Sequence, residues 1–186
     1  MSRARHRPLG GLRLSVGVLP IVLGLLDGIT NALGLAAHSI LGGGGGVGLG
    51  LALRVACFAL VTAVFAIFVA RYIELRVGLI RAGRQLNLLE RGALATTRLG
   101  RAARRDAAAD AAQASVASFS GALLPLGVAA AFPAYPWLPL ALAVGMLTLV
   151  GLVIGRRLRG NPGLWAAALA VAGIILIGIG AALNIA

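Results

Sequence analysis

The feature of this sequence that most limits its fold is a series of five apolar stretches. They cover residues 14–41, 47–70, 112–132, 138–154 and 164–183. A helix needs about 20 predominantly apolar residues to cross the roughly 30 Å hydrocarbon core of a bilayer. Charged residues make up only 12% of the chain, whereas a soluble domain carries about 25%. We therefore predict an all-α integral membrane protein with five transmembrane helices.

The charges between these stretches predict an orientation. Arginines are concentrated in the N-terminal tail, in the segment between the second and third stretches, and at 156–159. The segments 42–46 and 133–139 carry no charge. Loops rich in arginine and lysine stay on the cytoplasmic side of a membrane. We expect a cytoplasmic N-terminus and a C-terminus outside, in a bacterial-type cell membrane.

The segment 71–111 differs from the rest of the chain. It contains nine arginines and four of the five acidic residues, among them Glu74 and Glu90. Apolar residues recur in it every three or four positions from Leu75 to Ala93, which is the spacing of one helical face. We predict that the second helix continues into the cytoplasm, turns near 92–100 and returns as an alanine-rich helix. This segment would be a cytoplasmic helical insert between helices 2 and 3.

One carboxylate, Asp27, interrupts the first apolar stretch. An ionisable group inside the hydrocarbon costs a few kcal/mol on insertion scales, and such a group is a candidate for function. A hard or borderline divalent cation takes oxygen ligands, and a carboxylate supplies both oxygen and charge. Asp27 is therefore the candidate metal ligand, and Thr30 and Asn31 offer further oxygens. The Thr30 hydroxyl has the alternative of bonding its own backbone.

Small residues recur four positions apart in two of the stretches. Gly24 and Gly28 lie in the first, and Gly151 and Gly155 lie in the fourth. This spacing places the two glycines of each pair on one face of a helix, where they permit close approach of a neighbouring helix. We expect both pairs to mark helix contacts.

Two motifs resemble the vacuolar iron transporter family of iron/manganese carriers. The first is Asp27-Gly28-Ile29-Thr30. The second is residues 117–126, Ala-Ser-Phe-Ser-Gly-Ala-Leu-Leu-Pro-Leu, which is similar to the family's third-span segment. The resemblance implies a five-span homodimer that transports iron or manganese, with Asp27 in the ion path and proton coupling as a further option. The metal would be cargo, and no cofactor is implied.

The second span departs from this family. Where the family has Met and then Gly-Glu-Tyr, this chain has Ile67 and then Ala70-Arg71-Tyr72. An insert with more arginines than acidic residues also repels divalent cations. The alternative is a transport-inactive relative with a structural or regulatory role in the membrane.

In that alternative an arginine pairs with Asp27, because a buried carboxylate costs less free energy when it is paired. Arg71 is the expected partner if the first helix begins at Pro20. Arg54 is the expected partner if it begins at Leu14.

Enzymatic and nucleic-acid functions find little support in the sequence. The histidines are His6 and His38, the cysteine is Cys57, and no catalytic triad, phosphate loop or Cys/His metal motif is present. The net charge of +12 would suit nucleic acid. However, the apolar stretches leave no room for a soluble basic domain. We expect a non-enzyme whose partner is membrane lipid and not nucleic acid.

Overall fold

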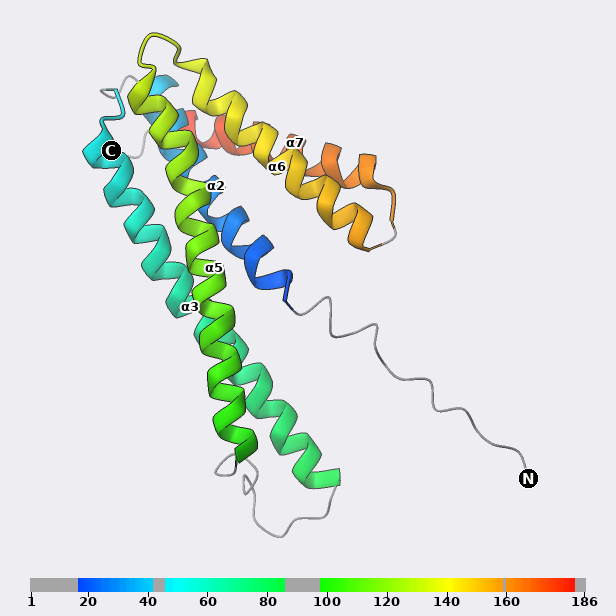
Figure 1. Cartoon of the computed structure of the whole chain (residues 1–186). Coiled ribbons are helices and arrows are strands. Elements are labelled where there is room, and N and C mark those ends of the chain that lie inside the picture. The colour runs from blue at the N-terminus through cyan, green and yellow to red at the C-terminus, as the bar shows by residue number, and fades with distance from the viewer. Residues whose placement is uncertain (1–16, 42–45, 86–97, 159, 183–186) are drawn as a thin grey trace.

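The computed structural model describes residues 17–41, 46–85, 98–158 and 160–182, and these are almost entirely helical. The helices are α2 (Leu19–Leu41), α3 (Leu49–Gln85), α5 (Arg98–Ala131), α6 (Trp137–Arg157) and α7 (Pro162–Ala182) (Figure 1). Each of the five is long and apolar enough to cross a membrane. The prediction of an all-α chain with five such helices is confirmed.

The first helix begins late in the first apolar stretch. It starts at Leu19, so Pro20 lies in its first turn. Proline is tolerated there because the N–H groups of a first turn have no partner within the helix. Of the two starting points considered, the structure favours the one near Pro20.

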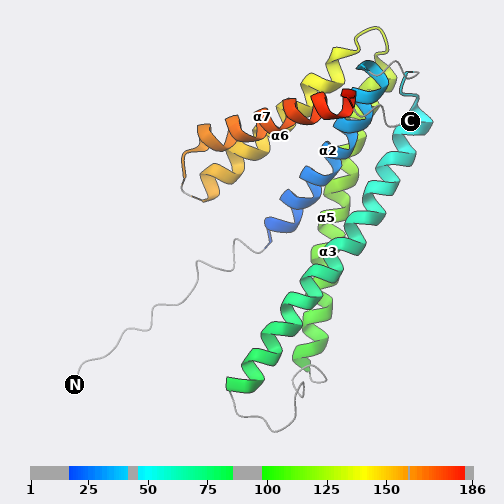
Figure 2. The same cartoon turned by 180° about the vertical axis from the view of Figure 1, so that it is seen from behind.

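Helices α3 and α5 extend well past the other helices. They contain 37 and 34 residues, whereas α2 contains 23. At about 1.5 Å per residue, α3 is about 55 Å long, more than a membrane core requires. The two helices project beyond the start of α2 as an antiparallel pair, visible from both sides (Figures 1 and 2). The expected insert is therefore a continuation of two long helices, and its predicted turn and Glu90 lie outside the described residues.

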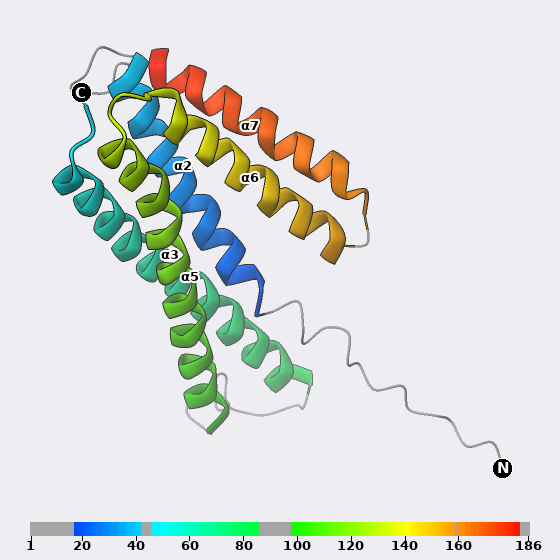
Figure 3. The ribbon, with the colours of Figure 1, turned by 45° about the horizontal axis from the view of Figure 1, so that its top comes forward.

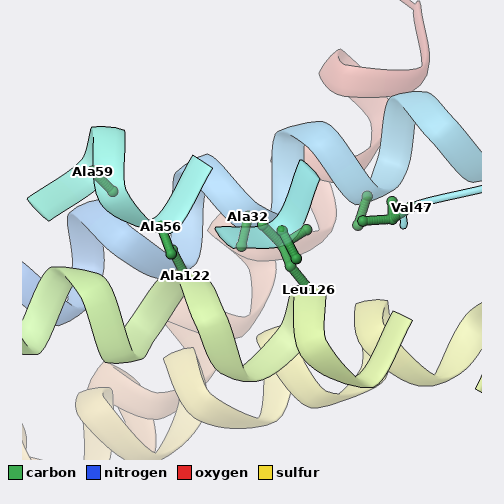
Figure 4. Close-up of a cluster of buried hydrophobic side chains, with 8 residues drawn as sticks. Ala32, Val47, Ala56, Ala59, Ala122 and Leu126 are labelled. Atoms are coloured by element: carbon green, nitrogen blue, oxygen red, sulfur yellow. The ribbon is translucent and has the colours of Figure 1, made fainter. Parts of the chain in front are cut away.

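Helix α2 lies at the centre of the bundle. It packs against α3 and α5 on one side and against the α6–α7 hairpin on the other (Figure 3). The contact between α2, α3 and α5 is built largely of alanines, including Ala32, Ala56 and Ala122, with Leu126 among them (Figure 4). Such small side chains let the three backbones approach closely.

The two glycine pairs lie at the closest helix contacts, as their spacing predicts. A Cβ atom at Gly24 or Gly28 would overlap the α5 backbone, at Ala114 and Ser118 respectively. A Cβ at Gly151 would lie 2.6 Å from the carbonyl oxygen of Trp165 on α7. Asp27 directly precedes Gly28 in the chain, so the close contact at Gly28 also brings the α5 backbone next to Asp27.

Candidate cation site

Asp27 lies on the face of α2 that meets α5, and its side chain is partly buried. One carboxylate oxygen, Oδ2, accepts a hydrogen bond of 2.8 Å from the hydroxyl of Ser118 on α5. The other, Oδ1, accepts a longer bond of 3.3 Å from the side-chain amide of Asn31, one turn further along α2. The carboxylate is therefore oriented by one residue of its own helix and one residue 91 positions away.

Ser118 connects three helices at this point. Its side chain is fully buried, and its hydroxyl oxygen also lies 3.2 Å from the carbonyl oxygen of Ala59 on α3. A serine hydroxyl has one proton, so it donates to Asp27 or to Ala59 at a given moment. Sequence reasoning placed Ser118 in the third-span motif but did not select it as a site residue. Its position in that motif was the available signal.

The other two expected ligands differ from each other in the structure. Asn31 lies next to the Asp27 carboxylate. The Thr30 hydroxyl instead donates a 3.0 Å hydrogen bond to the main-chain carbonyl oxygen of Asp27. The Thr30 hydroxyl thus bonds the backbone of its own helix, which was one of the two expected possibilities, and does not contact the Asp27 carboxylate.

The expected pair between Arg71 and Asp27 is not formed. Arg71 Nε lies 2.7 Å from Asp110 Oδ2, and Arg71 Nη1 lies 2.6 Å from Glu74 Oε2. Ala59 is the α3 residue level with Asp27, and Arg71 lies about 18 Å further along that helix at 1.5 Å per residue. The sequence placed these residues near the same end of the bundle, but the register of α3 puts Arg71 opposite Asp110.

Arg54 does not replace Arg71 as a partner. Its side chain is exposed, and it takes part in neither of the ion pairs found among the described residues. Within that part of the chain, Asp27 therefore has hydrogen-bond donors but no basic side chain to balance its charge.

The atoms around Asp27 are suited to a hard cation. The carboxylate, the Ser118 hydroxyl, the Asn31 side chain and the Ala59 carbonyl lie within one small region of three helices. The oxygens of Asp27, Ser118 and Ala59 are of the kind that magnesium, calcium and manganese prefer, whereas Asn31 turns its amide nitrogen toward the carboxylate. The described residues contain no group of three or more His, Cys, Asp or Glu side chains placed to hold a metal. The site thus supplies one charged ligand, and a divalent ion bound there would keep part of its water shell.

The Arg71–Asp110 pair joins α3 to α5 at the point where these two long helices, here called the long hairpin, extend beyond the start of α2. Arg71 and Asp110 are 15% and 13% exposed, and Arg71 is the basic side chain paired with Asp110 among the described residues. We expect Arg71→Gln to lower the free energy of unfolding by about 2 kcal/mol, because it leaves a partly buried carboxylate unpaired. Adding Asp110→Asn should recover part of this loss, with a coupling energy of about 1–3 kcal/mol.

Reversible unfolding of the four proteins of this double-mutant cycle in mixed micelles measures the coupling. Glu74→Gln is the matched control. Glu74 is 67% exposed, so its removal should cost less than about 1 kcal/mol. A coupling energy near zero would show that the pair does not stabilise the hairpin.

Comparison with protein-family models, curated proteins and solved structures finds no match to this chain. The likeness to the iron/manganese carriers therefore rests on the motifs at residues 27–30 and 117–126.

Proposed function

We propose that this protein is a membrane transporter of a divalent cation of the iron/manganese type, with Asp27 as the charged ligand in the ion path. The observation that carries the proposal is the uncompensated carboxylate. Asp27 lies among five helices of membrane-spanning length, is held by Ser118 and Asn31, and contacts no basic side chain in the described residues. A carboxylate kept in such a place without a counter-ion is suited to receive a mobile cation.

The surface of the bundle supports a membrane location. Large apolar side chains are exposed along the outward faces of α3 and α7, among them Phe58 (69% exposed), Phe65 (74%) and Ile174 (60%). Exposed apolar surface of this extent is unfavourable in water and favourable against hydrocarbon. In the proposed orientation the arginine-rich hairpin and the N-terminus are cytoplasmic. A homodimer remains the expectation from the family resemblance.

Uptake of manganese or ferrous iron into proteoliposomes tests this function. The purified protein should accelerate entry of the ion over empty liposomes, and calcium and magnesium added in excess should show how selective the site is. Repeating the assay with and without a pH gradient tests coupling to protons. Uptake no faster than in empty liposomes under any of these conditions would overturn the transport proposal.

One observation favours the second candidate, a relative without transport activity that serves a structural or regulatory role in the membrane. At the position where the resembled family has a glutamate, Arg71 is locked into the hairpin by Asp110 and Glu74. At this position the chain therefore has a basic side chain that joins α3 to α5, and it offers no carboxylate to a metal. Complete absence of flux together with a large Arg71–Asp110 coupling energy would support this candidate.

A further inference from the structure

A groove runs between α2 and α5 on the outside of the bundle. It has a volume of about 550 Å³ and is largely open to the outside of the bundle. Its lining is almost entirely apolar and is contributed by Ile21, Leu25, Ala112, Gln113, Val116, Ala117 and Ser120. The groove is separate from Asp27, because Ser118 turns to the interior of the bundle while Val116 is exposed.

The groove has the right depth for the acyl chain of a lipid. Gly121 contacts Ile29, so it is level with the middle of α2. From Gly121, Ala112 lies about 13 Å toward the start of α5 at 1.5 Å per residue. Half the thickness of a hydrocarbon core is about 15 Å. With the middle of α2 at the bilayer centre, the groove therefore spans one leaflet, the one on the side of the long hairpin.

A basic residue lies beyond the end of the groove at headgroup depth. Arg105 precedes Ala112 by two helical turns and Val116 by three, so the three residues share one face of α5. Arg105 is exposed and lies about 24 Å from the level of Gly121 along the helix. The headgroup region ends about 20–22 Å from the bilayer centre, so the flexible Arg105 side chain reaches it. Asp106 is also exposed here, and Arg101 lies one turn further out.

Gln113 adds a polar group between these two parts. It is exposed, lines the groove and lies about 12 Å from the level of Gly121. That depth is close to the boundary between hydrocarbon and headgroups, where the ester groups of a phospholipid lie. An amide at this depth can donate a hydrogen bond to an ester carbonyl.

We propose that the α2–α5 groove binds one anionic phospholipid. This lipid lies in the leaflet on the side of the arginine-rich ends of α3 and α5. An acyl chain occupies the apolar groove, Gln113 bonds the ester region, and Arg105 binds the phosphate. Basic residues next to a membrane attract anionic lipids in this way, and each contributes about fivefold to the affinity near the surface. A phospholipid is the occupant we infer because its three parts match three features of the protein in the same order. The acyl chain matches the apolar groove, the ester region matches the Gln113 amide, and the phosphate matches the Arg105 guanidinium.

Native mass spectrometry of the full chain in detergent, titrated with phosphatidylglycerol or phosphatidylcholine, tests the proposal. Phosphatidylglycerol should bind at least about fivefold more tightly than phosphatidylcholine. Arg105→Gln should remove about fivefold of the phosphatidylglycerol affinity and leave phosphatidylcholine unchanged. The matched control Arg156→Gln removes the same charge from the end of α6 and should change either affinity by less than about twofold. Equal effects of the two substitutions would overturn the site.

A second variant separates the lipid from other occupants. Ser120→Phe fills the groove and should lower the affinity for both lipids, while the thermal unfolding midpoint in detergent reports that the bundle is intact. Glycerophosphoglycerol, which has the headgroup and no acyl chains, should not displace the bound lipid. Displacement by it would indicate a phosphate site without a lipid. Loss of a dimer in Ser120→Phe with unchanged lipid binding would show that a second copy of the chain occupies the groove. Either result would overturn the proposal.

Discussion

Replacing Asp27 by asparagine is expected to reduce cation uptake into proteoliposomes by at least about 100-fold, because a divalent ion loses its one charged ligand. Asparagine has nearly the same size and shape as aspartate. Its side-chain oxygen can still accept the 2.8 Å hydrogen bond from Ser118, so the contact between α2 and α5 should survive. The predicted loss corresponds to about 2.7 kcal/mol in the barrier, a modest fraction of what one charge contributes in a low-dielectric site.

The stability of Asp27→Asn should be at least that of the wild-type protein. A neutral side chain costs less than a charged one inside the bundle, and no basic residue is left without its partner in the described part of the chain. Initial uptake rates at several manganese concentrations, together with unfolding in mixed micelles, measure both effects.

Two further variants show whether the charge or the local packing matters. Asp106→Asn makes the same chemical change at an exposed carboxylate of α5 and should leave uptake close to wild type. Ser118→Ala removes the hydroxyl that orients Asp27 and should lower uptake by about tenfold, the effect of losing one hydrogen bond to a charged group. Uptake by Asp27→Asn within a factor of three of wild type would exclude this carboxylate as the ligand.

The second large effect is expected at Gly28. A Cβ atom there would overlap the carbonyl oxygen of Ser118 and lie 2.9 Å from the amide nitrogen of Ala122. Both are backbone atoms of α5, so neither moves out of the way as a flexible side chain would. Gly28→Ala should therefore separate α2 from α5 and cost about 3 kcal/mol of stability, at the upper end for overpacking.

Gly34→Ala is the matched control on the same helix. A Cβ at Gly34 meets nothing within 4 Å, so this substitution should be neutral or stabilise the protein by up to about 1 kcal/mol through helix propensity. The difference between the two variants in mixed-micelle unfolding isolates the close contact. Gly28→Ala should also reduce uptake, because separating the helices breaks the bond between Ser118 and Asp27. Equal stability of the two alanine variants would contradict a close backbone contact between α2 and α5 at Gly28.

The helices of this protein could be predicted from the sequence because a membrane-spanning helix depends on the apolar residues within one continuous stretch of chain. Five apolar stretches correspond to five helices of membrane-spanning length. The three- and four-residue spacing after Leu75 correctly indicated that the second helix continues, since one strip of apolar residues can only pack if the segment is helical. The helix bounds were less accurate. The sequence left the start of α2 open between Leu14 and Pro20, and the helix begins at Leu19. Helix α5 begins at Arg98, within the segment 92–100 where a turn was expected.

The candidate site was predictable only in part. Asp27 is conspicuous in sequence because its charge contradicts its surroundings. Asn31 follows from it because residues four apart on a helix are neighbours. Thr30 was ambiguous, since a hydroxyl has a backbone acceptor within reach in its own helix, and the structure shows that it uses that acceptor.

By itself, then, the sequence determined the number and type of the helices, the continuation of the second helix beyond its apolar stretch, and the single carboxylate within the apolar stretches. The tertiary structure alone decided which side chains meet. Ser118 reaches Asp27 across 91 positions, and Arg71 meets Asp110 across 39. The physical reason is that periodicity specifies the faces of each helix but not the register between helices. Here the register depends on which glycines and alanines allow two helix backbones to come into contact. This register places Arg71 beside Asp110 and Asp27 beside Ser118.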